Sequence, residues 1–177
     1  VSVMAGVPSR RIQSALGGLC AVVRAMPNAP CAIKEGVIGL ASGAGSTDEH
    51  LHRARALLTP IGTVIDVAES DLHAVTAVSG SGPAYVYAVA KAMIDGGVAA
   101  GLSPEIARPL AIETLRGAAG VLKVSTTPVE EMIGAIATAG GTTEAAINAM
   151  ARGGLHEAIV NGVLAASERS RELAREE

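Results

Sequence analysis

The stretch that organises the fold spans residues 138–150 and reads Thr138-Ala139-Gly140-Gly141-Thr142-Thr143-Glu144-Ala145-Ala146-Ile147-Asn148-Ala149-Met150. Two glycines and two threonines precede a run of strong helix formers, so the stretch predicts a tight turn followed by a helix. We expect Thr142 or Thr143 to cap that helix. The first N–H groups of a helix lack internal partners and favour an anion. The loop therefore predicts a carboxylate or phosphate site, with an ordinary helix start as the alternative.

The composition of the chain indicates a mainly helical protein. Hydrophobic residues make up 49% of the 177 residues, but there is no Phe or Trp. The core must therefore be aliphatic and rich in Ala, which favours helices. A net charge of −3 excludes a basic surface for nucleic acid. No apolar run reaches the ~18–20 residues of a membrane span, and no His or Cys spacing fits a metal site. We expect a cytoplasmic protein.

Residues 1–67 alternate apolar, strand-like runs with helix signals, which is typical of an α/β layer. A capping-box pattern, Ser46-x-x-Glu49, predicts a helix over residues 47–58, and Ser9 predicts the cap of an earlier one ending at Leu16. The layer lacks the opening strand, Gly-x-Gly-x-x-Gly turn and helix of a dinucleotide-binding domain, so we expect its N-terminal half to be missing. Strands are predicted at residues 1–7, 21–26, 37–41 and 62–67.

Residues 68–177 carry helix signals only. Ser81-Gly82-Pro83 predicts a break in the chain, Ser103-Pro104 a helix start, and Thr127-x-x-Glu130 a capping box for a further helix. Pro109 predicts a kink or a late start of the helix that contains it. The helices are apolar on more than one face, which predicts an oligomer. Further helices are predicted at residues 84–98, 143–151 and 155–175.

Four motifs together resemble the pyrroline-5-carboxylate reductase family, and the likeness extends over nearly the whole chain. They are Met26-Pro27-Asn28-Ala29-Pro30, Ala77-Val78-Ser79-Gly80-Ser81-Gly82-Pro83-Ala84-Tyr85, Asp95-Gly96-Gly97-Val98 with Gly101-Leu102, and Gly140-Gly141-Thr142-Thr143. The resemblance implies reduction of 1-pyrroline-5-carboxylate to L-proline by hydride transfer from NADPH or NADH, the last step of proline biosynthesis. It also implies a homodimer or a larger assembly of dimers.

The same resemblance defines the expected fold class, α/β followed by all-α. Residues 1–67 would be the C-terminal half of a Rossmann-like doubly wound domain, and residues 68–177 a helical dimerisation and substrate domain. Pro27, Asn28 and Ala29 would border the nicotinamide. The catalytic residue would be Thr143, whose hydroxyl lies near the ring nitrogen of the imine acid. The substrate-binding residues implied are Glu69, Thr138, Gly140, Gly141, Thr142 and Thr143.

The chain departs from the family pattern at two places. Thr138-Ala139 stands where Ser-Pro is usual, and Ala29 stands where Thr is usual. A related enzyme for another imine or 2-oxo/hydroxy acid, or a non-catalytic dimerisation module, therefore stays open as an alternative. Local alternatives are a helix-start carboxylate at Glu69, a loop-ending Asn28 and a plain turn over residues 79–83. The chain by itself is expected to be inactive, because the cofactor fingerprint is absent from it.

Overall fold

The computed structural model describes residues 1–176, with side chains up to residue 175. The chain forms two compact units. The first contains Val1–Ala84 together with the chain from Val160 onward, and the second contains Tyr85–Ile159. The boundary predicted between residues 67 and 68 follows the last strand. The division into compact units instead keeps the next helical turns and most of the last helix with the sheet.

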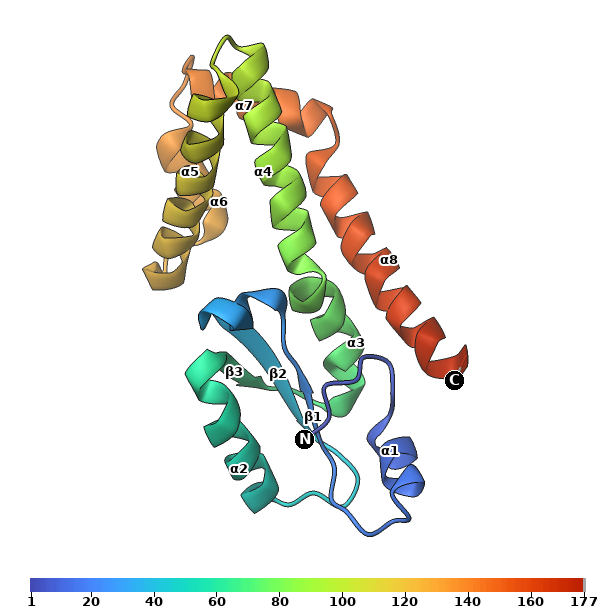
Figure 1. Ribbon diagram of the computed structural model, residues 1–177. Coiled ribbons are helices and arrows are strands. Elements are labelled where there is room, and N and C mark those ends of the chain that lie inside the picture. Colours follow the sequence, from blue (N-terminus) through green and yellow to red (C-terminus); the bar gives the residue numbers. More distant parts are fainter. Residues whose placement is uncertain (177) are drawn as a thin grey trace. The chain divides into compact units, whose positions relative to one another are not determined.

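A three-stranded mixed sheet forms the centre of the first unit (Figure 1). β1 (Val23–Met26) runs antiparallel to β2 (Gly36–Ser42), and β2 runs parallel to β3 (Gly62–Asp66). The three strands predicted downstream of residue 20 are confirmed. The strand predicted over residues 1–7 is wrong, because only Ser2 forms a bridge, parallel to β1. The chain turns at Gly6, whose φ is 76°.

One face of this sheet carries the hydrophobic core of the first unit. Ile38 and Leu40, two residues apart on β2, are fully buried. Helix α2 (Asp48–Leu58) covers this face in Figure 1. Each large aliphatic side chain buried here contributes about 1.5–3 kcal/mol to folding. The other buried members of the core are Val23, Ala25 and Ala54.

Helix α2 has a capping box, but one residue later than predicted. Thr47 is the N-cap, and the Nδ1 atom of His50 accepts the Thr47 N–H at 3.1 Å. The box predicted from Ser46 and Glu49 is wrong, because the Ser46 hydroxyl is used in the preceding turn. It donates to the Gly43 carbonyl at 2.8 Å and accepts the Gly43 N–H at 3.0 Å.

Three short helical elements connect the strands of the first unit. α1 begins at Ser9, as predicted, although the N-cap residue is Pro8. The 3-10 helix η1 follows β1, and the 3-10 helix η2 leads from α2 into β3. The bounds of the three elements are α1 (Ser9–Ala15), η1 (Ala29–Ile33) and η2 (Thr59–Ile61).

The chain leaves the sheet through a continuous helical run. The run consists of η3 (Glu69–Asp71), α3 (Leu72–Val75), the π-helix η4 (Thr76–Gly80) and α4 (Gly82–Ala99). The break predicted at Ser81-Gly82-Pro83 is therefore wrong. Ser81 keeps helical angles, with φ −82° and ψ −21°. Pro83 lies in the first turn of α4, where a missing N–H costs nothing.

The remaining elements are α5 (Pro104–Val124), α6 (Val129–Ile136), α7 (Thr142–Arg152) and α8 (Leu155–Glu176). Ser103 is the N-cap of α5 and Pro104 its first residue, as predicted. α5 runs through Pro109, so a late start is wrong. The capping box predicted from Thr127 is also wrong, because Pro128 holds the N-cap position of α6 and has no side-chain donor or acceptor. No helix within residues 1–176 is long and apolar enough to cross a membrane.

Candidate functional site

The predicted substrate loop lies between α6 and α7 in the second unit. The Gly141 N–H donates to the Thr138 carbonyl at 2.9 Å, which closes a tight turn. Gly140 lies inside this turn with a φ of 72°, in the left-handed region that favours glycine. Gly141 is the N-cap of α7, and no side chain caps the helix. The predicted turn and helix are confirmed, whereas the cap predicted at Thr142 or Thr143 is wrong.

Gly141 is required by a close approach to the backbone. A Cβ atom at this position would lie 2.7 Å from Thr138 Oγ1 and 2.9 Å from the Thr138 carbonyl oxygen. Both distances are shorter than real Cβ contacts, and the carbonyl cannot rotate away without opening the turn. A side chain at residue 141 would therefore change the loop itself.

The N–H groups at the start of α7 differ in availability. The Gly140 N–H donates to Glu144 Oε2 at 2.7 Å, and the Gly141 N–H is used in the turn. Within residues 1–176, the N–H groups of Thr142 and Thr143 have no hydrogen-bond partner. An anion at this helix start would therefore contact Thr142 and Thr143, with the Glu144 carboxylate nearby.

The predicted cofactor loop follows β1 in the first unit. The Asn28 carboxamide oxygen accepts the Val37 N–H at 3.0 Å and lies 3.9 Å from Cys31 Sγ. Asn28 thus ties the end of β1 to the start of β2, and the exposed Ala29 opens η1. β1 runs parallel to the bridge at Ser2, so the loop lies at the carboxyl end of parallel strands. Nucleotides bind at such ends in open α/β sheets.

Glu69 lies in a polar network that the sequence did not reveal. Its two carboxylate oxygens accept the Ser9 N–H at 2.6 Å and the Ser9 hydroxyl at 2.7 Å. Arg24, whose side chain is 7% exposed, lies 3.5 Å from the same carboxylate and donates to the Met4 carbonyl at 2.7 Å. These contacts place a carboxylate at the first turn of α1, where a negative charge is favourable. A substrate-binding role for Glu69 stays a prediction.

A second polar contact joins α3 to α8 within the first unit. His73 Nδ1 and Ser170 Oγ lie 2.9 Å apart, and Ser170 is buried. Burial lowers the pKa of His73 from its ordinary value, and the charges of Arg171 and Arg24 lower it further, while Glu168 opposes them. The imidazole is therefore held in its neutral form. The sequence gave no signal for this pair, because its members lie 97 positions apart.

The predicted site residues fall into groups on the two units. Thr138, Gly140 and the first residues of α7 belong to the second unit, whereas Pro27–Ala29 and Glu69 belong to the first. The functional sequence pattern did not identify Arg24 or Glu144. Arg24 could have been found, because it interrupts the apolar run of β1, and a charge in a buried strand requires a partner.

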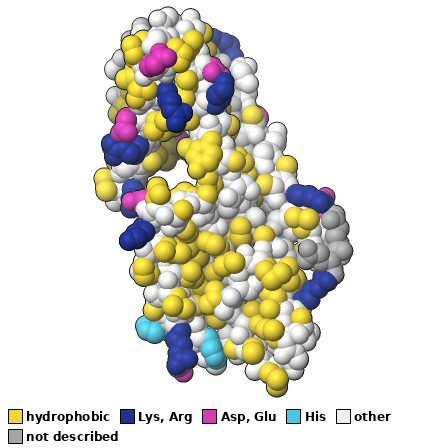
Figure 2. All heavy atoms as spheres, in the orientation of Figure 1, with side chains coloured by type: hydrophobic (Ala, Val, Ile, Leu, Met, Phe, Trp, Pro, Cys, Tyr) yellow, Lys and Arg dark blue, Asp and Glu magenta, His cyan; other side chains and the backbone are white. Residues whose placement is uncertain are grey.

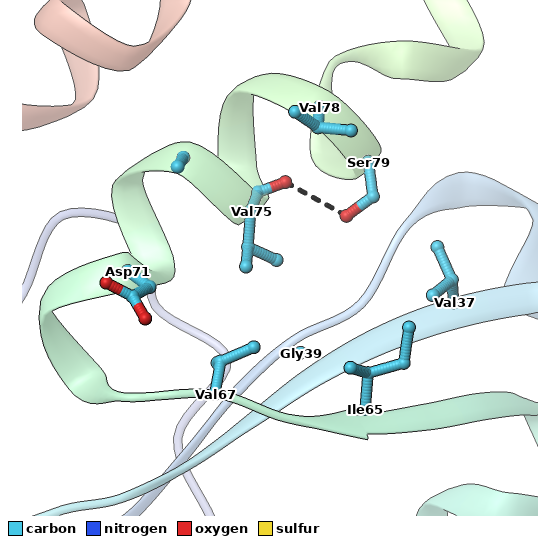
Figure 3. A pocket seen from close by; sticks show the side chains of 9 residues that line it. Val37, Gly39, Ile65, Val67, Asp71, Val75, Val78 and Ser79 are labelled. Atoms are coloured by element: carbon cyan, nitrogen blue, oxygen red, sulfur yellow. Dashed lines mark hydrogen bonds between the residues drawn. The ribbon is translucent and has the colours of Figure 1, made fainter.

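A cavity of about 410 Å³ lies in the first unit between the sheet and the helical run (Figure 3). Aliphatic side chains of both parts face it. Of its two polar lining residues, Ser79 donates its hydroxyl to the Val75 carbonyl at 2.9 Å, and Asp71 lies at the edge. Its lining offers no set of polar groups for an imine acid. The other lining residues are Val37, Gly39, Ile65, Val67, Ala74 and Val78.

The fold and the two loops define a class of protein in which part of an α/β domain is joined to a helical domain with unpartnered apolar faces. Comparison with known families agrees: residues 69–173 match the family described as pyrroline-5-carboxylate reductase dimerisation. The chain belongs to this family.

Individual relatives extend the match beyond the helical domain. The chain is 38% identical over 175 residues to pyrroline-5-carboxylate reductase of Synechocystis sp., covering 99% of this chain and 65% of the relative. It is 39% identical over 191 residues to the Mycobacterium tuberculosis reductase, covering 98% and 64%. The crystal structure of Plasmodium falciparum pyrroline carboxylate reductase with NADP bound superposes with a TM-score of 0.91 at 29% identity, covering 98% of this chain and 68% of that one. The chain thus spans about 65% of the length of its Synechocystis relative.

Proposed function

We propose that the protein acts as a pyrroline-5-carboxylate reductase and reduces 1-pyrroline-5-carboxylate to L-proline with NADPH or NADH. The observation that carries the proposal is the match over residues 69–173 together with 38% identity to a reductase across 99% of the chain. The start of α7 supports it, because two N–H groups without partners in residues 1–176 suit a carboxylate.

The nicotinamide cofactor supplies the hydride when it is bound. Pro27, Asn28 and Ala29 would hold its reactive end in place. The loop fits this role in two respects. Asn28 is fixed through its carboxamide oxygen, and the loop lies at the carboxyl end of parallel strands, where dinucleotides bind.

The residues at the start of α7 would bind and orient the imine acid. The N–H groups of Thr142 and Thr143 would hold the substrate carboxylate. The Thr143 hydroxyl would bond the ring nitrogen, which places the imine carbon for hydride transfer. Gly140 and Gly141 would shape the loop rather than donate to the substrate, because their N–H groups are already used. Thr138 would act through its carbonyl, which closes the turn.

The protein would work as a homodimer or a larger assembly of dimers. Figure 2 shows many apolar side chains at the surface of the single chain. Several belong to α4 and α5, where large apolar side chains are more than half exposed. They include Val86 at 51%, Tyr87 at 63%, Ile106 at 52%, Leu110 at 55% and Val121 at 54%. Patches of this kind mark interfaces. A cytoplasmic location stays a prediction.

An activity screen tests the proposed function. A form of the protein that carries a complete cofactor domain would be assayed with 1-pyrroline-5-carboxylate, with other cyclic imines and with 2-hydroxy acids. NADPH or NADH oxidation with the pyrroline, and proline as the product, is the expected result. A preference for another imine, or turnover of 2-hydroxy acids alone, would replace the proposal by the related-enzyme alternative.

A further inference from the structure

The π-helix η4 makes one very close approach to β1. A Cβ atom on Gly80, the last residue of η4, would lie 2.8 Å from Cε of Met26. Real Cβ atoms do not come so close, so the Met26 methyl group occupies the space that a side chain at residue 80 would need. Met26 is the last residue of β1 and directly precedes the predicted cofactor loop.

A second glycine lets the other end of the helical run approach the sheet. A Cβ atom on Gly39 of β2 would lie 2.7 Å from Val75 Cγ1, at the end of α3. Between the run and β3 lies the cavity, which Val75 and Ser79 face in Figure 3. The run is therefore not packed against β3 there, and close contacts at Gly39 and Gly80 decide how it lies on the sheet.

The loop beyond Met26 has little freedom of its own. Pro27 has a fixed φ, and Asn28 is bound to the Val37 N–H at 3.0 Å. One end of the loop is thereby held by β2. The other end is Met26, which lies against Gly80. A displacement of Met26 must pass to Pro27, because no flexible residue stands between them.

We propose that Gly80 and Met26 form a positioning contact that sets the place of the Pro27–Ala29 loop and thereby the affinity for the nicotinamide cofactor. The inference rests on the proposed function, because it takes this loop to border the nicotinamide. Gly80 lies inside residues 69–173, which match the dimerisation family, and Met26 lies outside them. The contact thus links the dimerisation segment to the cofactor loop.

A double-variant cycle tests the contact in a form of the protein with a complete cofactor domain. Gly80→Ala sets a methyl group against Met26 and should raise the Kd for NADPH roughly 3- to 10-fold, within the range of coupled neighbours. In the Met26→Ala background the same change meets free space, and its effect should shrink to less than about twofold. The KM for NADPH should follow the Kd, while kcat at saturation changes less.

The control is Gly82→Ala, which adds the same methyl group two residues later, where no heavy atom lies within 4 Å. Its effect on the Kd should be the same with and without Met26. A Gly80→Ala effect that is equal in both backgrounds, or a lower Tm with an unchanged Kd, overturns the positioning contact alone. Failure of the unaltered protein to bind NADPH overturns the proposed function and this inference together. If Gly80→Ala does not fold, Met26→Ala should restore folding, and continued failure overturns the contact.

Discussion

Thr143 lies half-buried in the first turn of α7, and its N–H has no partner within residues 1–176. Thr143→Val keeps the shape of the side chain and removes the hydroxyl. We expect kcat/KM for pyrroline-5-carboxylate to fall roughly 10- to 100-fold, because a hydrogen bond to a charged group is worth about 1.5–3 kcal/mol. Steady-state kinetics on a form with a complete cofactor domain measures this. Unchanged kinetics at unchanged Tm would make Thr143 an ordinary helix-start residue.

Gly141 tests the loop itself. Gly141→Ala places a Cβ atom 2.7 Å from Thr138 Oγ1 and should lower the free energy of unfolding by about 1–3 kcal/mol, as overpacking does. Gly134→Ala in α6 is the control, because its Cβ would meet no atom within 4 Å and Ala favours helix. Urea unfolding of the two variants compares them. Equal stability would show that the turn can widen without cost.

Residue identities were predictable where backbone geometry demands them, and less so where polar partners come from distant segments. Gly140 and Gly141 could be placed in a turn from sequence because glycine is needed there. The partners of Glu69 could not, since Ser9 lies 60 positions away. Glu144 was expected only as a first-turn charge, and its bond to the Gly140 N–H depends on how the turn folds back.

Most elements were predictable because apolar periodicity and Pro or Gly boundaries agree along this chain. β1, β2, β3 and the helices from α4 onward lie close to their predicted ranges. The failures are at helix starts and at η4. Two capping boxes were wrong because neighbouring residues hold the N-cap position, and the Ser81–Pro83 motif was misinterpreted because Gly and Pro also fit a first helical turn.

The contact between α3 and α8 predicts a pH dependence of stability. The pKa of His73 is lowered in the folded protein, mainly by burial, from its ordinary value of 6.5. The unfolded chain therefore binds a proton at a higher pH than the folded one. The free energy of unfolding should fall as the pH drops through 6.5, until the folded pKa is reached.

His73→Gln removes this titration and keeps a group that can bond Ser170 Oγ. Urea unfolding of both proteins at about pH 7.5 and about pH 5.5 gives the comparison. The variant should lose less stability on acidification than the parent. An identical loss in both would assign the pH dependence to other groups, among them Glu168, Arg171 and the remaining histidines.

At the scale of the whole molecule, assembly is the first consequence of the exposed apolar helices. Ala88 lies on α4 and is exposed in the single chain. Ala88→Asp should shift the protein toward monomer or aggregate, because an unpaired charge buried at an interface is strongly unfavourable. Light scattering at micromolar concentration measures the mass. A folded monomer in the unaltered protein would contradict the proposed homodimer.

Cofactor binding by the chain as it stands is the second whole-molecule test. No Gly-x-Gly-x-x-Gly turn occurs in the 177 residues. The pyrophosphate of a dinucleotide then lacks the helix start on which it usually rests. We expect this chain alone to bind NADPH weakly or not at all and to show no reductase activity. Calorimetric titration decides the matter, and micromolar binding would place the cofactor site within these residues.

The π-helix η4 also acts as a phase shift between two helices of one run. A π-turn accommodates one more residue than an α-turn of the same rise, and each residue of an α-helix advances the side chains by about 100°. Deleting one residue of η4 would leave a helix there but rotate every α4 side chain by roughly that angle with respect to α3. The apolar stripe of α4 would then face a different direction. The extra residue in η4 therefore encodes the azimuth of the predicted interface, separately from its chemistry.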